Sequence, residues 1–574
     1  MRATSDQQPH LAPRSLAGPL APERPRSEWL LRAADARRRG RPDEALSIYL
    51  RLLATTPADV EALYGAALLS KELGNLDQAE ALCGRGQQAD PVNPDFWNLQ
   101  GTVAWDRKRG QDALGCLDRA ATLRSEIPQI WFNRGIILTG LGDIEGAIAA
   151  YERALALEPH YFAAAQNLVF LRDVASDGPE MFEERRRFAA TFAAPFAAGL
   201  APHPNDRTVR RRLRIGYVSG DFWIHSAAFI FCPVILAHDW DEVQVYCYSN
   251  QAEHIDPLTE VMRNEVKWRF VKHLTDAELA EVIRLDRIDI LMDLSGFSNG
   301  TRYLVFARKP APVQVTAWGH ALGTGLPTMD ALFADPIAAP LATRDWFTER
   351  VWDLPNLMAY QAPAIAPPVA GPPAGPITFG SFNRLMKLSP RTLDWWAEIL
   401  LSVPDSRLLL KYGSYDVPDA VLRLRAEFHR RRVDPDRVFC EGSTSQKTHL
   451  ERYAAVDLSL DPYPHGGGMT TLESLLMGVP VLTCAGPYIN SRTGISVLTA
   501  VGMPEWVTTS GDEYVRGAID RVRARGSLAE IRGGLRERLL RSPICQIPAY
   551  TRAVEAVYRH LWLRWLAKAD KVPA

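Results

Sequence analysis

The chain has 574 residues, of which 47% are hydrophobic and 23% charged, and its formal net charge is −1. This length exceeds what a single hydrophobic core supports, so we expect several domains. The near-zero charge argues against a dedicated nucleic-acid-binding protein, which would need a surplus of lysine and arginine.

The cysteines and the first residues indicate a cellular compartment. Seven cysteines are scattered along the chain without a Cys-x-x-Cys pair, which is typical of reduced thiols in a cytosolic protein. Residues 1–26 are polar and proline-containing, without the apolar core of a signal peptide, and are predicted to be disordered. No stretch reaches the ~18 uninterrupted apolar residues of a membrane span. We therefore expect a soluble, cytoplasmic protein that binds neither membrane nor nucleic acid.

The first part of the chain repeats itself with a period of 34 residues. An alanine recurs at Ala45, Ala79, Ala113 and Ala147. A large apolar residue recurs at Trp29, Leu63, Trp97 and Trp131, and a small one at Ala33, Ala67, Gly101 and Gly135. A glycine precedes the alanine in three units, at Gly40, Gly74 and Gly142, and Lys108 takes its place in the remaining unit.

This pattern predicts pairs of short helices that cross closely at the small residues and turn at the glycines. It resembles four tetratricopeptide repeats. We assign residues 27–175 to these repeats, including a capping helix at about 160–173. A repeat array of this kind binds a partner polypeptide and carries no chemistry of its own, so the chemistry is expected further along the chain.

Beyond a predicted helical linker at 176–212, short β-rich apolar runs alternate with helical stretches. Strands of a first lobe, 213–360, are predicted at 213–218, 243–248, 288–294, 313–318 and 331–334, with a helix at 276–285. A proline-rich linker at 361–376 precedes a second lobe, 377–574. Its strands are predicted at 377–382, 408–411, 438–440, 458–461 and 479–483, and a closing helix at 549–567. The fold class is thus an α-solenoid followed by two doubly wound, Rossmann-like α/β lobes, with a ligand cleft at their strand ends.

The stretch 458–482 reads as a strand, a glycine turn, a helix and a strand. Its three glycines, 466–468, let the backbone approach a phosphate, and Thr470 and Thr471 open a helix whose free N–H groups favour negative charge. Glu473 lies one turn inside, where it can accept hydrogen bonds from ribose hydroxyls. A plain strand–helix turn with Ser/Thr capping is the alternative. The combination of residues favours a nucleotide-binding turn.

Five segments together resemble the O-linked N-acetylglucosamine (O-GlcNAc) transferase and SPINDLY family, in that family's order. They are 214–225 (RIGYVSGDFWIH), 310–319 (PAPVQVTAWG), 382–387 (FNRLMK), 449–452 (HLER) and 458–482. With the repeats, the resemblance covers nearly the whole chain from about residue 27, and it fits bacterial members with few repeats. It implies the GT-B glycosyltransferase architecture and no cofactor apart from a nucleotide-sugar donor substrate.

Two residues are the candidate catalytic groups. His225 follows the first strand of the first lobe. A lone histidine is commonly structural, but the family's histidine at this position lies near the reacting centre and has been considered as a general base. Lys387 follows a strand of the second lobe and could be a solvated charge. The family's matching lysine neutralises the diphosphate of the leaving group, a role that suits a fixed cation because that group gains charge in the transition state.

The resemblance also implies a set of residues that bind the nucleotide sugar. They are Asn383, Arg384, His449, Arg452, Gly467, Gly468, Thr470, Thr471, Glu473, Gly319 and Thr324. His449 and Arg452, one helical turn apart, match residues that contact the base. The chain departs from the family at Arg384, where glutamine is usual, at Met386, which replaces an aromatic residue, and in the turn 318–325, which lacks a Pro-Gly-Thr.

Three further motifs are set aside. The segment 442–447 resembles a phosphate-binding loop but lacks the glycine before its lysine. Asp239-Trp-Asp241 and Asp434-Pro-Asp436 mimic the metal-binding Asp-x-Asp of other glycosyltransferases, but they are predicted in turns away from the cleft motifs. We therefore expect no metal site.

These observations predict an inverting, metal-independent transferase that moves N-acetylglucosamine from UDP-N-acetylglucosamine to serine or threonine hydroxyls of acceptor proteins, which the repeats present. Two alternatives remain open. The donor could be GDP-fucose, as the SPINDLY branch implies. The lobes could also form a nucleotide-binding scaffold with little turnover, a reading that the departures at Arg384 and Met386 would suit.

Overall fold

The computed structural model describes residues 25–196, 200, 202–251, 255–319 and 322–569. The segment predicted to be disordered, 1–26, lies outside the described residues except for Pro25 and Arg26. Residue contacts divide the chain into two compact units, Met1–Arg107 with Gly115–Ser125 and Lys108–Leu114 with Glu126–Ala574.

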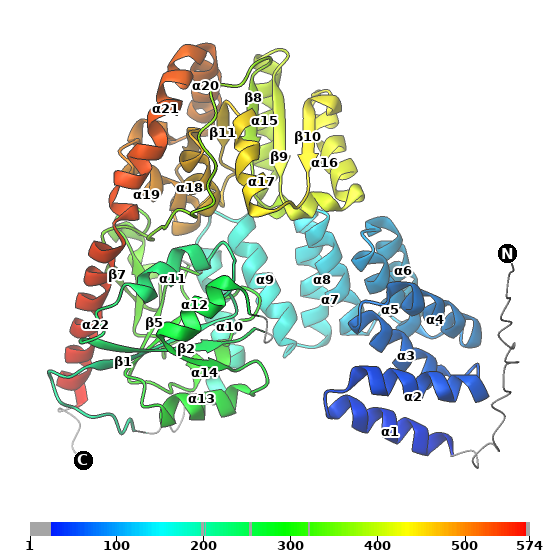
Figure 1. The fold of residues 1–574 in the computed structure, drawn as a ribbon. Helices are drawn as coiled ribbons and strands as arrows, with labels where there is room; N and C mark the ends of the chain where they lie inside the picture. Colours follow the sequence, from blue (N-terminus) through cyan, green and yellow to red (C-terminus); the bar gives the residue numbers. More distant parts are fainter. Residues whose placement is uncertain (1–24, 197–199, 201, 252–254, 320–321, 570–574) are drawn as a thin grey trace, which may run out of the picture. The chain divides into compact units, whose positions relative to one another are not determined.

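The first unit contains helix pairs at the predicted interval (Figure 1). Its helices are α1 (Arg26–Arg38), α2 (Pro42–Thr55), α3 (Val60–Glu72), α4 (Leu76–Ala89) and α5 (Pro94–Asp106), and α6 (Gly110–Leu123) continues the series. The recurring small residues pack inside, since Ala33, Ala45, Ala67 and Ala79 are fully buried. The periodicity therefore predicted these helix pairs correctly.

The turn inside each pair explains the recurring glycine. Gly40, Gly74 and Gly142 have φ angles of 69°, 78° and 77°, in the left-handed region that costs glycine little. Lys108 adopts the same conformation, with φ 64°, where the third repeat departs from the pattern. The shared geometry of the turn overrides the residue preference at this position.

The second unit begins with helices that pack on the lobes. They are α7 (Pro128–Gly140), α8 (Ile144–Leu157), α9 (Phe162–Ala175) and α10 (Glu180–Phe192). α9 is the predicted capping helix and α10 falls in the predicted linker. The side chain of Gln166 on α9 donates to the carbonyl oxygen of Phe297 at 3.1 Å, and Phe188 on α10 joins the apolar core of the first lobe.

The first lobe is built on a seven-stranded, wholly parallel sheet in the order β3-β2-β1-β4-β5-β6-β7. Its strands are β1 (Leu213–Ser219), β2 (Val243–Ser249), β3 (Lys267–Phe270), β4 (Ile290–Asp293), β5 (Val313–Thr316), β6 (Ala331–Ala334) and β7 (Arg350–Asp353). The edge strands β3 and β7 were not predicted. Both are partly exposed, so neither has the continuous apolar run that marks a buried parallel strand.

The second lobe repeats this winding on a six-stranded parallel sheet in the order β10-β9-β8-β11-β12-β13. Its strands are β8 (Thr378–Ser381), β9 (Arg407–Lys411), β10 (Val438–Glu441), β11 (Leu458–Leu460), β12 (Val481–Cys484) and β13 (Val507–Thr508). Both sheets place the first strand of the lobe beside the fourth, as in a Rossmann fold. The predicted fold class, helical repeats followed by two Rossmann-like lobes, is confirmed.

Helices cover the faces of both sheets (Figure 1). Those of the first lobe are α11 (Ala228–Leu236), α12 (Pro257–Glu265), α13 (Asp276–Leu285) and α14 (Tyr303–Ala307). Those of the second are α15 (Pro390–Ser402), α16 (Pro418–Arg430), α17 (Gln446–Glu451), α18 (Met469–Leu476), α19 (Thr493–Ala500), α20 (Gly511–Arg523) and α21 (Arg525–Arg541). α13 has the bounds predicted from sequence, because a capping box of Thr275 and Glu278 marks its start.

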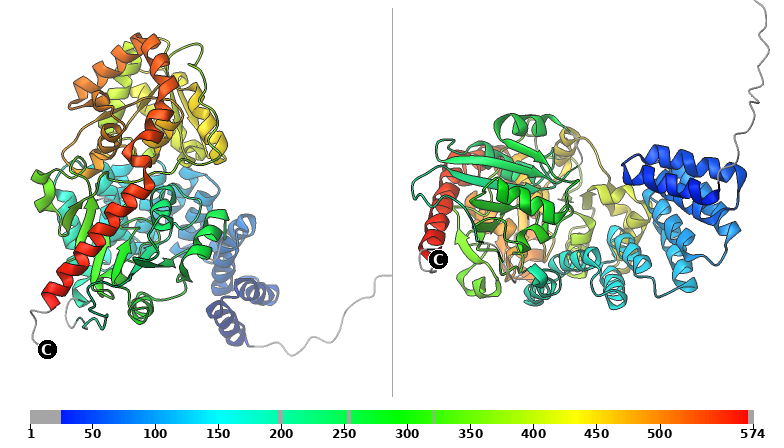
Figure 2. Two further views of the ribbon diagram at one scale, coloured as in Figure 1. Left: turned by 60° about the vertical axis from the view of Figure 1, so that its left-hand side comes forward. Right: turned by 90° about the horizontal axis from the view of Figure 1, so that it is seen from below.

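The last helix, α22 (Ile547–Ala569), leaves the second lobe and runs along the first (Figure 2). Buried hydrogen bonds fix it there. The hydroxyl of Tyr558 lies 2.8 Å from that of Tyr217 on β1, and Glu555 lies 2.9 Å from Nδ1 of His238. Trp318, at the end of β5, donates its indole N–H to the hydroxyl of Tyr550 at 2.9 Å. α22 therefore ties the lobes together.

Among the described residues, no helix combines the length and the apolar character needed to cross a membrane.

Candidate active site in the interlobe cleft

Residues from both lobes line one cleft of about 720 Å³. In each sheet the chain winds in opposite directions from the two adjacent central strands, β1 and β4 or β8 and β11. This is the switch point at which open α/β sheets bind ligands. The lining includes predicted site residues from both lobes, namely His225, Gly319, Asn383, Arg384, Lys387, His449, Gly468, Thr470 and Glu473.

Lys387 ends a short turn, Leu385–Lys387, that follows β8. Its Nζ donates to the carbonyl oxygen of Gly466 at 2.9 Å and lies 3.5 Å from Oδ1 of Asn383. Burial, and then the charge of Arg384, lower the pKa of Lys387 to about 8, against the opposing effect of Asp461. The ammonium group thus has neutral hydrogen-bond acceptors at the edge of the cleft, where an anionic ligand would stabilise its charge.

Arg384 places a second positive charge in the cleft. Its Nε donates to the hydroxyl of Tyr412 at 2.9 Å, which holds the guanidinium beside that ring. The charge of Arg384 affects the pKa values of ionisable groups on both lobes. It lowers the pKa of Lys387 in its own lobe and, after burial, that of His225 in the other.

His225 and Asp221 follow β1 and form a pair at the opposite wall. His225 Nδ1 lies 3.6 Å from Oδ1 of Asp221. Burial lowers the pKa of His225 and raises that of Asp221, so both groups favour their neutral forms more than they would in water. The backbone N–H of Ala227 donates to Nδ1 of His225 at 3.3 Å. The Ala227 contact suits a ring that carries its proton on Nε2, whereas the Asp221 carboxylate suits one protonated on Nδ1.

The glycine turn and α18 contribute the remaining polar groups of the second lobe. The Oγ1 of Thr470 donates to Oδ1 of Asn383 at 3.2 Å. Glu473 Oε2 lies 3.2 Å from Nε2 of His449, whose ring packs against Phe382. The first backbone N–H groups of α18 have no intrahelical acceptor, so this end of the cleft favours an anion.

Four predicted residues are placed outside the lining. Arg452 Nη2 pairs with Glu441 at 2.6 Å, and Thr324 donates its backbone N–H and its hydroxyl to the buried Glu349. Gly467 and Thr471 lie behind the cleft surface, where Gly467 N–H donates to Asp461 at 2.9 Å. These residues support neighbouring elements.

The cleft also contains residues that were not predicted. Ser443, Thr444 and Gln446 line it, although the segment 442–447 had been set aside as an incomplete phosphate loop. They follow β10, so the rule that selected residues at other strand ends would have found them. Phe170 and Val174 of α9 also line the cleft. No local motif marks them, because the fold brings them there from the repeat region.

The two Asp-x-Asp motifs form turns. Asp241 donates its backbone N–H to the Asp239 carboxylate at 3.0 Å, and Asp436 does the same with Asp434 at 3.0 Å. Neither motif is in the cleft lining. Among the described residues, no group of three or more His, Cys, Asp or Glu side chains is placed to hold a metal ion.

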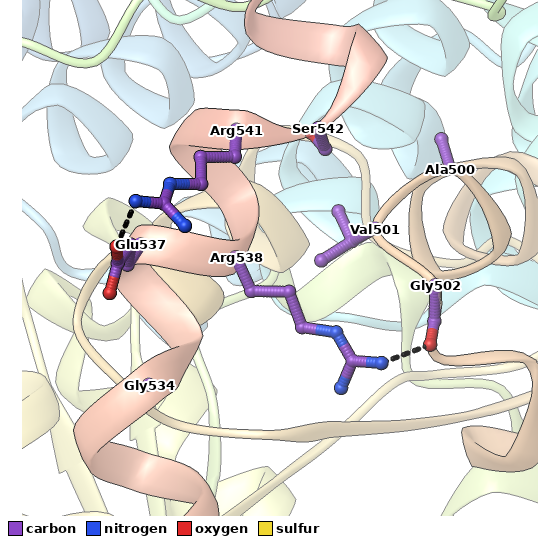
Figure 3. Close-up of a pocket in the computed structure, with 8 residues that line it drawn as sticks. All are labelled: Ala500, Val501, Gly502, Gly534, Glu537, Arg538, Arg541 and Ser542. Carbon is purple, nitrogen blue, oxygen red and sulfur yellow. Dashed lines mark hydrogen bonds and ion pairs between the residues drawn. The ribbon is translucent and has the colours of Figure 1, made fainter.

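A second pocket, of about 440 Å³, lies between α21 and the end of α19 (Figure 3). Arg538 donates to the carbonyl oxygen of Gly502 across it, and Arg541 pairs with Glu537 on the same helix. None of the residues predicted to form the site lines this pocket. The interlobe cleft is therefore the candidate active site.

Comparison with protein families agrees with this arrangement. Residues 199–359 and 369–554 match the model of glycosyl transferase family 41, and residues 36–102 and 128–161 match tetratricopeptide-repeat models. The matched family segments contain both lobes and the cleft residues that follow their strands.

Individual relatives point the same way. The probable UDP-N-acetylglucosamine–peptide N-acetylglucosaminyltransferase SPINDLY of Oryza sativa subsp. japonica is 32% identical over 429 residues, covering 73% of this chain and 46% of that protein. A UDP-N-acetylglucosamine–peptide N-acetylglucosaminyltransferase of Caenorhabditis elegans is 23% identical, covering 62% and 41%. The chain thus spans less than half the length of these relatives. A mutant Thermobaculum terrenum O-GlcNAc transferase is 34% identical with a TM-score of 0.82, covering 89% of this chain and 98% of that one.

Proposed function

Because the chain belongs to glycosyl transferase family 41, we propose that it is a protein O-GlcNAc transferase that uses UDP-N-acetylglucosamine as its donor. The acceptor is a serine or threonine hydroxyl of a protein. The observation that carries this proposal is the placement of Lys387 in the cleft, beside Arg384 and the start of α18. These groups offer positive charge where a nucleoside diphosphate would leave.

The proposed reaction is a direct displacement that inverts the anomeric carbon. The acceptor oxygen attacks that carbon as its bond to the diphosphate breaks, and the acceptor proton passes to a base or to water. Lys387 stabilises the charge that develops on the diphosphate. Glu473 accepts hydrogen bonds from the ribose at the acceptor sites that its present partner, His449, leaves open.

His225 is proposed to position the reactants. Its lowered pKa keeps the ring neutral near pH 7, and its Nδ1 accepts the N–H of Ala227. In the tautomer that accepts the N–H of Ala227, Nε2 carries the proton, and the ring then orients a hydroxyl through Nε2–H rather than removing a proton at that atom. The proposal therefore leaves His225 out of the proton transfer.

The reaction is proposed to need no metal ion, since two side-chain cations and a helix start supply the charge that a metal would otherwise provide. Transfer in EDTA at the rate seen without it would support this view. Activity that EDTA removes and manganese restores would contradict it. We expect no cofactor besides the donor.

GDP-fucose is the second candidate donor, and one observation favours keeping it. Arg452, expected at the base, pairs with Glu441 outside the cleft lining and so provides no argument for uracil. Of the two residues expected to contact the nucleotide base, only His449 lines the cleft. A scaffold with little turnover would bind nucleotide in this cleft without hydrolysing or transferring the sugar.

Calorimetric titration of the whole chain with UDP and with GDP tests the donor. We expect UDP to bind about tenfold to a hundredfold more tightly, because in a base site that fits a pyrimidine a purine would strain the packing by ~1–3 kcal/mol. Tighter binding of GDP would move the proposal to fucose. Incubation with UDP-N-acetylglucosamine and a serine-containing peptide then tests turnover, and nucleotide binding without transfer or hydrolysis would favour the scaffold.

A further inference from the structure

Asp461 is a buried carboxylate directly behind the glycine turn. It follows β11, its backbone N–H donates to the carbonyl oxygen of Leu482 at 3.0 Å, and only 3% of its surface is exposed. It is not part of the cleft lining. Burying a carboxylate is costly unless specific partners compensate for the lost water, so its surroundings indicate what it does.

Glycines surround this carboxylate. A Cβ atom added to Gly467 would lie 2.6 Å from Oδ1 of Asp461, and one added to Gly494 on α19 would lie 2.6 Å from Oδ2. Any side chain at either position would collide with the carboxylate. The glycines of the turn therefore have a second role besides approach to a phosphate, because they let the backbone close around Asp461.

One peptide group joins Asp461 to Lys387. The N–H of Gly467 donates to Oδ1 of Asp461 at 2.9 Å. The carbonyl oxygen of Gly466, the other end of the same peptide group, accepts from Nζ of Lys387 at 2.9 Å. The carboxylate lies at the positive end of this peptide dipole and the ammonium at its negative end, so each contact strengthens the other.

We propose that Asp461 is a positioning residue that fixes the Gly466–Gly467 peptide group, so that its carbonyl oxygen holds the ammonium of Lys387 at the diphosphate position of the cleft. This inference rests on the proposed function, in which Lys387 stabilises the leaving diphosphate. Asp461 touches neither donor nor acceptor. It acts only through the peptide group and through its charge.

The charges agree with this arrangement. Burial raises the pKa of Asp461 to about 6, while Thr483, Lys387 and the N–H of Gly467 favour its ionised form. The charged groups acting on Lys387 are Arg384, on its own turn, and Asp461, at the end of β11. Arg384 favours the neutral amine and Asp461 favours the ammonium. Removal of the Asp461 charge should therefore lower the pKa of Lys387 further.

Asp461→Asn provides the test, because the amide oxygen can still accept the N–H of Gly467 while the charge is gone. We expect the alkaline limb of the kcat/KM profile, which reports the free enzyme, to move to lower pH by roughly one unit, as expected for loss of a nearby opposite charge. KM for the donor should change less than kcat. A folded variant with the wild-type pH profile and wild-type kcat would show that Asp461 serves only stability.

Asp457→Asn is the matched control. Asp457 lies at the other end of the same strand, is also buried, and accepts the backbone N–H of Thr378 at 2.9 Å, away from the cleft. The Asp457→Asn variant should be less stable than the wild type but should keep the wild-type pH profile. An alkaline limb that moves as far as in Asp461→Asn would overturn the proposal.

If the Asp461→Asn variant does not fold, Asp461→Glu provides the test of the positioning role. It keeps the charge but has no room beside the glycines to place its oxygen at the same point. We expect a lower kcat with an unmoved alkaline limb, and a wild-type kcat would overturn the proposal. Lys387→Ala separates the two hypotheses, because unchanged turnover in that variant would reject the proposed function of Lys387 whatever the Asp461 variants do.

Discussion

Two positive charges, on Arg384 and Lys387, are held close together in a largely buried cleft. Burial, and then the repulsion between the two charges, brings the pKa of Lys387 down to about 8. A bound diphosphate would favour both charges and raise that pKa again. Binding of the donor near pH 8 should therefore be accompanied by uptake of a proton, which makes affinity sensitive to pH in the mildly alkaline range.

Arg384→Gln should change both the strength and the pH dependence of UDP binding. Lys387 is protonated below its pKa and neutral above it, so affinity is full at lower pH and falls as pH rises through about 8. The variant keeps the burial that lowers this pKa but lacks the Arg384 charge that lowers it further, so the fall should begin at somewhat higher pH. Affinity at pH 7 should drop about tenfold, because one charge-assisted contact of ~1.4 kcal/mol is lost.

Calorimetric titrations with UDP between pH 6.5 and 9.5 would measure this effect. Arg391→Gln is a suitable control, because Arg391 pairs with Asp177 at 2.9 Å and is not in the cleft lining. If the UDP affinity of the Arg384→Gln variant falls over the same pH range as that of the wild type, Arg384 does not influence the pKa of Lys387.

Individual residues could be predicted where a strand end, the glycine turn or a family motif selects them. His225 and Lys387 follow β1 and β8, and the structure places both in the cleft. Arg452 shares a helical turn with His449, yet Glu441 holds it elsewhere. The sequence predicts Asp461 only as the last residue of a strand, because its approach to Gly467 and Gly494 depends on how the chain returns in space. Sequence spacing carries no information on such partners.

At the scale of elements, the sequence predicts the central strands better than the edges. Buried parallel strands are recognised by their apolar runs, whereas β13 has only two residues and β3 and β7 are exposed or half-buried along their length. The closing helix was predicted from its length and amphipathic pattern. Its role as a connection between the lobes was not, because hydrogen bonds such as that between Trp318 and Tyr550 join residues far apart in sequence.

Tyr550→Phe tests whether α22 supports the cleft. Trp318 lines the cleft, has a φ angle of 58°, and uses the Tyr550 hydroxyl as its indole acceptor. Loss of this acceptor leaves a buried N–H unsatisfied, which should lower the free energy of unfolding by about 1–3 kcal/mol. Ligand binding in the cleft should weaken as well, because the indole is then free to move.

Tyr558→Phe is the comparison on the same helix. The hydroxyl of Tyr217 keeps His238 as a partner, at 2.6 Å, when that of Tyr558 is removed. Thermal unfolding and UDP titration of both variants would separate stability from site geometry. Equal UDP affinity in wild type and Tyr550→Phe would show that α22 supports only the fold.

Across the second unit, the helices before the lobes belong to the site. Phe170 and Val174 of α9 line the cleft, and Asn490 of the second lobe donates to the carbonyl oxygen of Asp173, at the same helix, at 3.0 Å. Gln166 binds the first lobe from that helix. The repeat pattern predicted α9 as a cap, but its contacts also make it a wall of the interlobe cleft.

The preceding pair, α7 and α8, supports the turn that carries Lys387. A Cβ atom at Gly142 would lie 2.9 Å from the side chain of Leu385, and Met386 packs against the apolar cluster that includes Leu138 and Ala147. Met386 replaces an aromatic residue of the family, and this packing gives it a structural role at the base of the helix pair. Changes in α7 and α8 can therefore reach Lys387 directly.

Two truncations should consequently behave differently. A chain that begins at Pro128 keeps α7 to α10, and we expect it to bind UDP within about threefold of the full chain, a difference of ~0.7 kcal/mol. Its transfer to protein acceptors should fall, because the removed repeats are proposed to present them.

A chain that begins at His160 lacks α7 and α8 and exposes Leu385 and Met386. The turn before Lys387 should then lose its packing, so UDP affinity should fall by tenfold or more, which corresponds to the ~1.4 kcal/mol that partial loss of apolar contacts readily costs. Circular dichroism would establish that both truncated chains are folded before calorimetric titration with UDP. Equal affinity in the two would show that α7 and α8 are dispensable for the site and act only with the other repeats in acceptor binding.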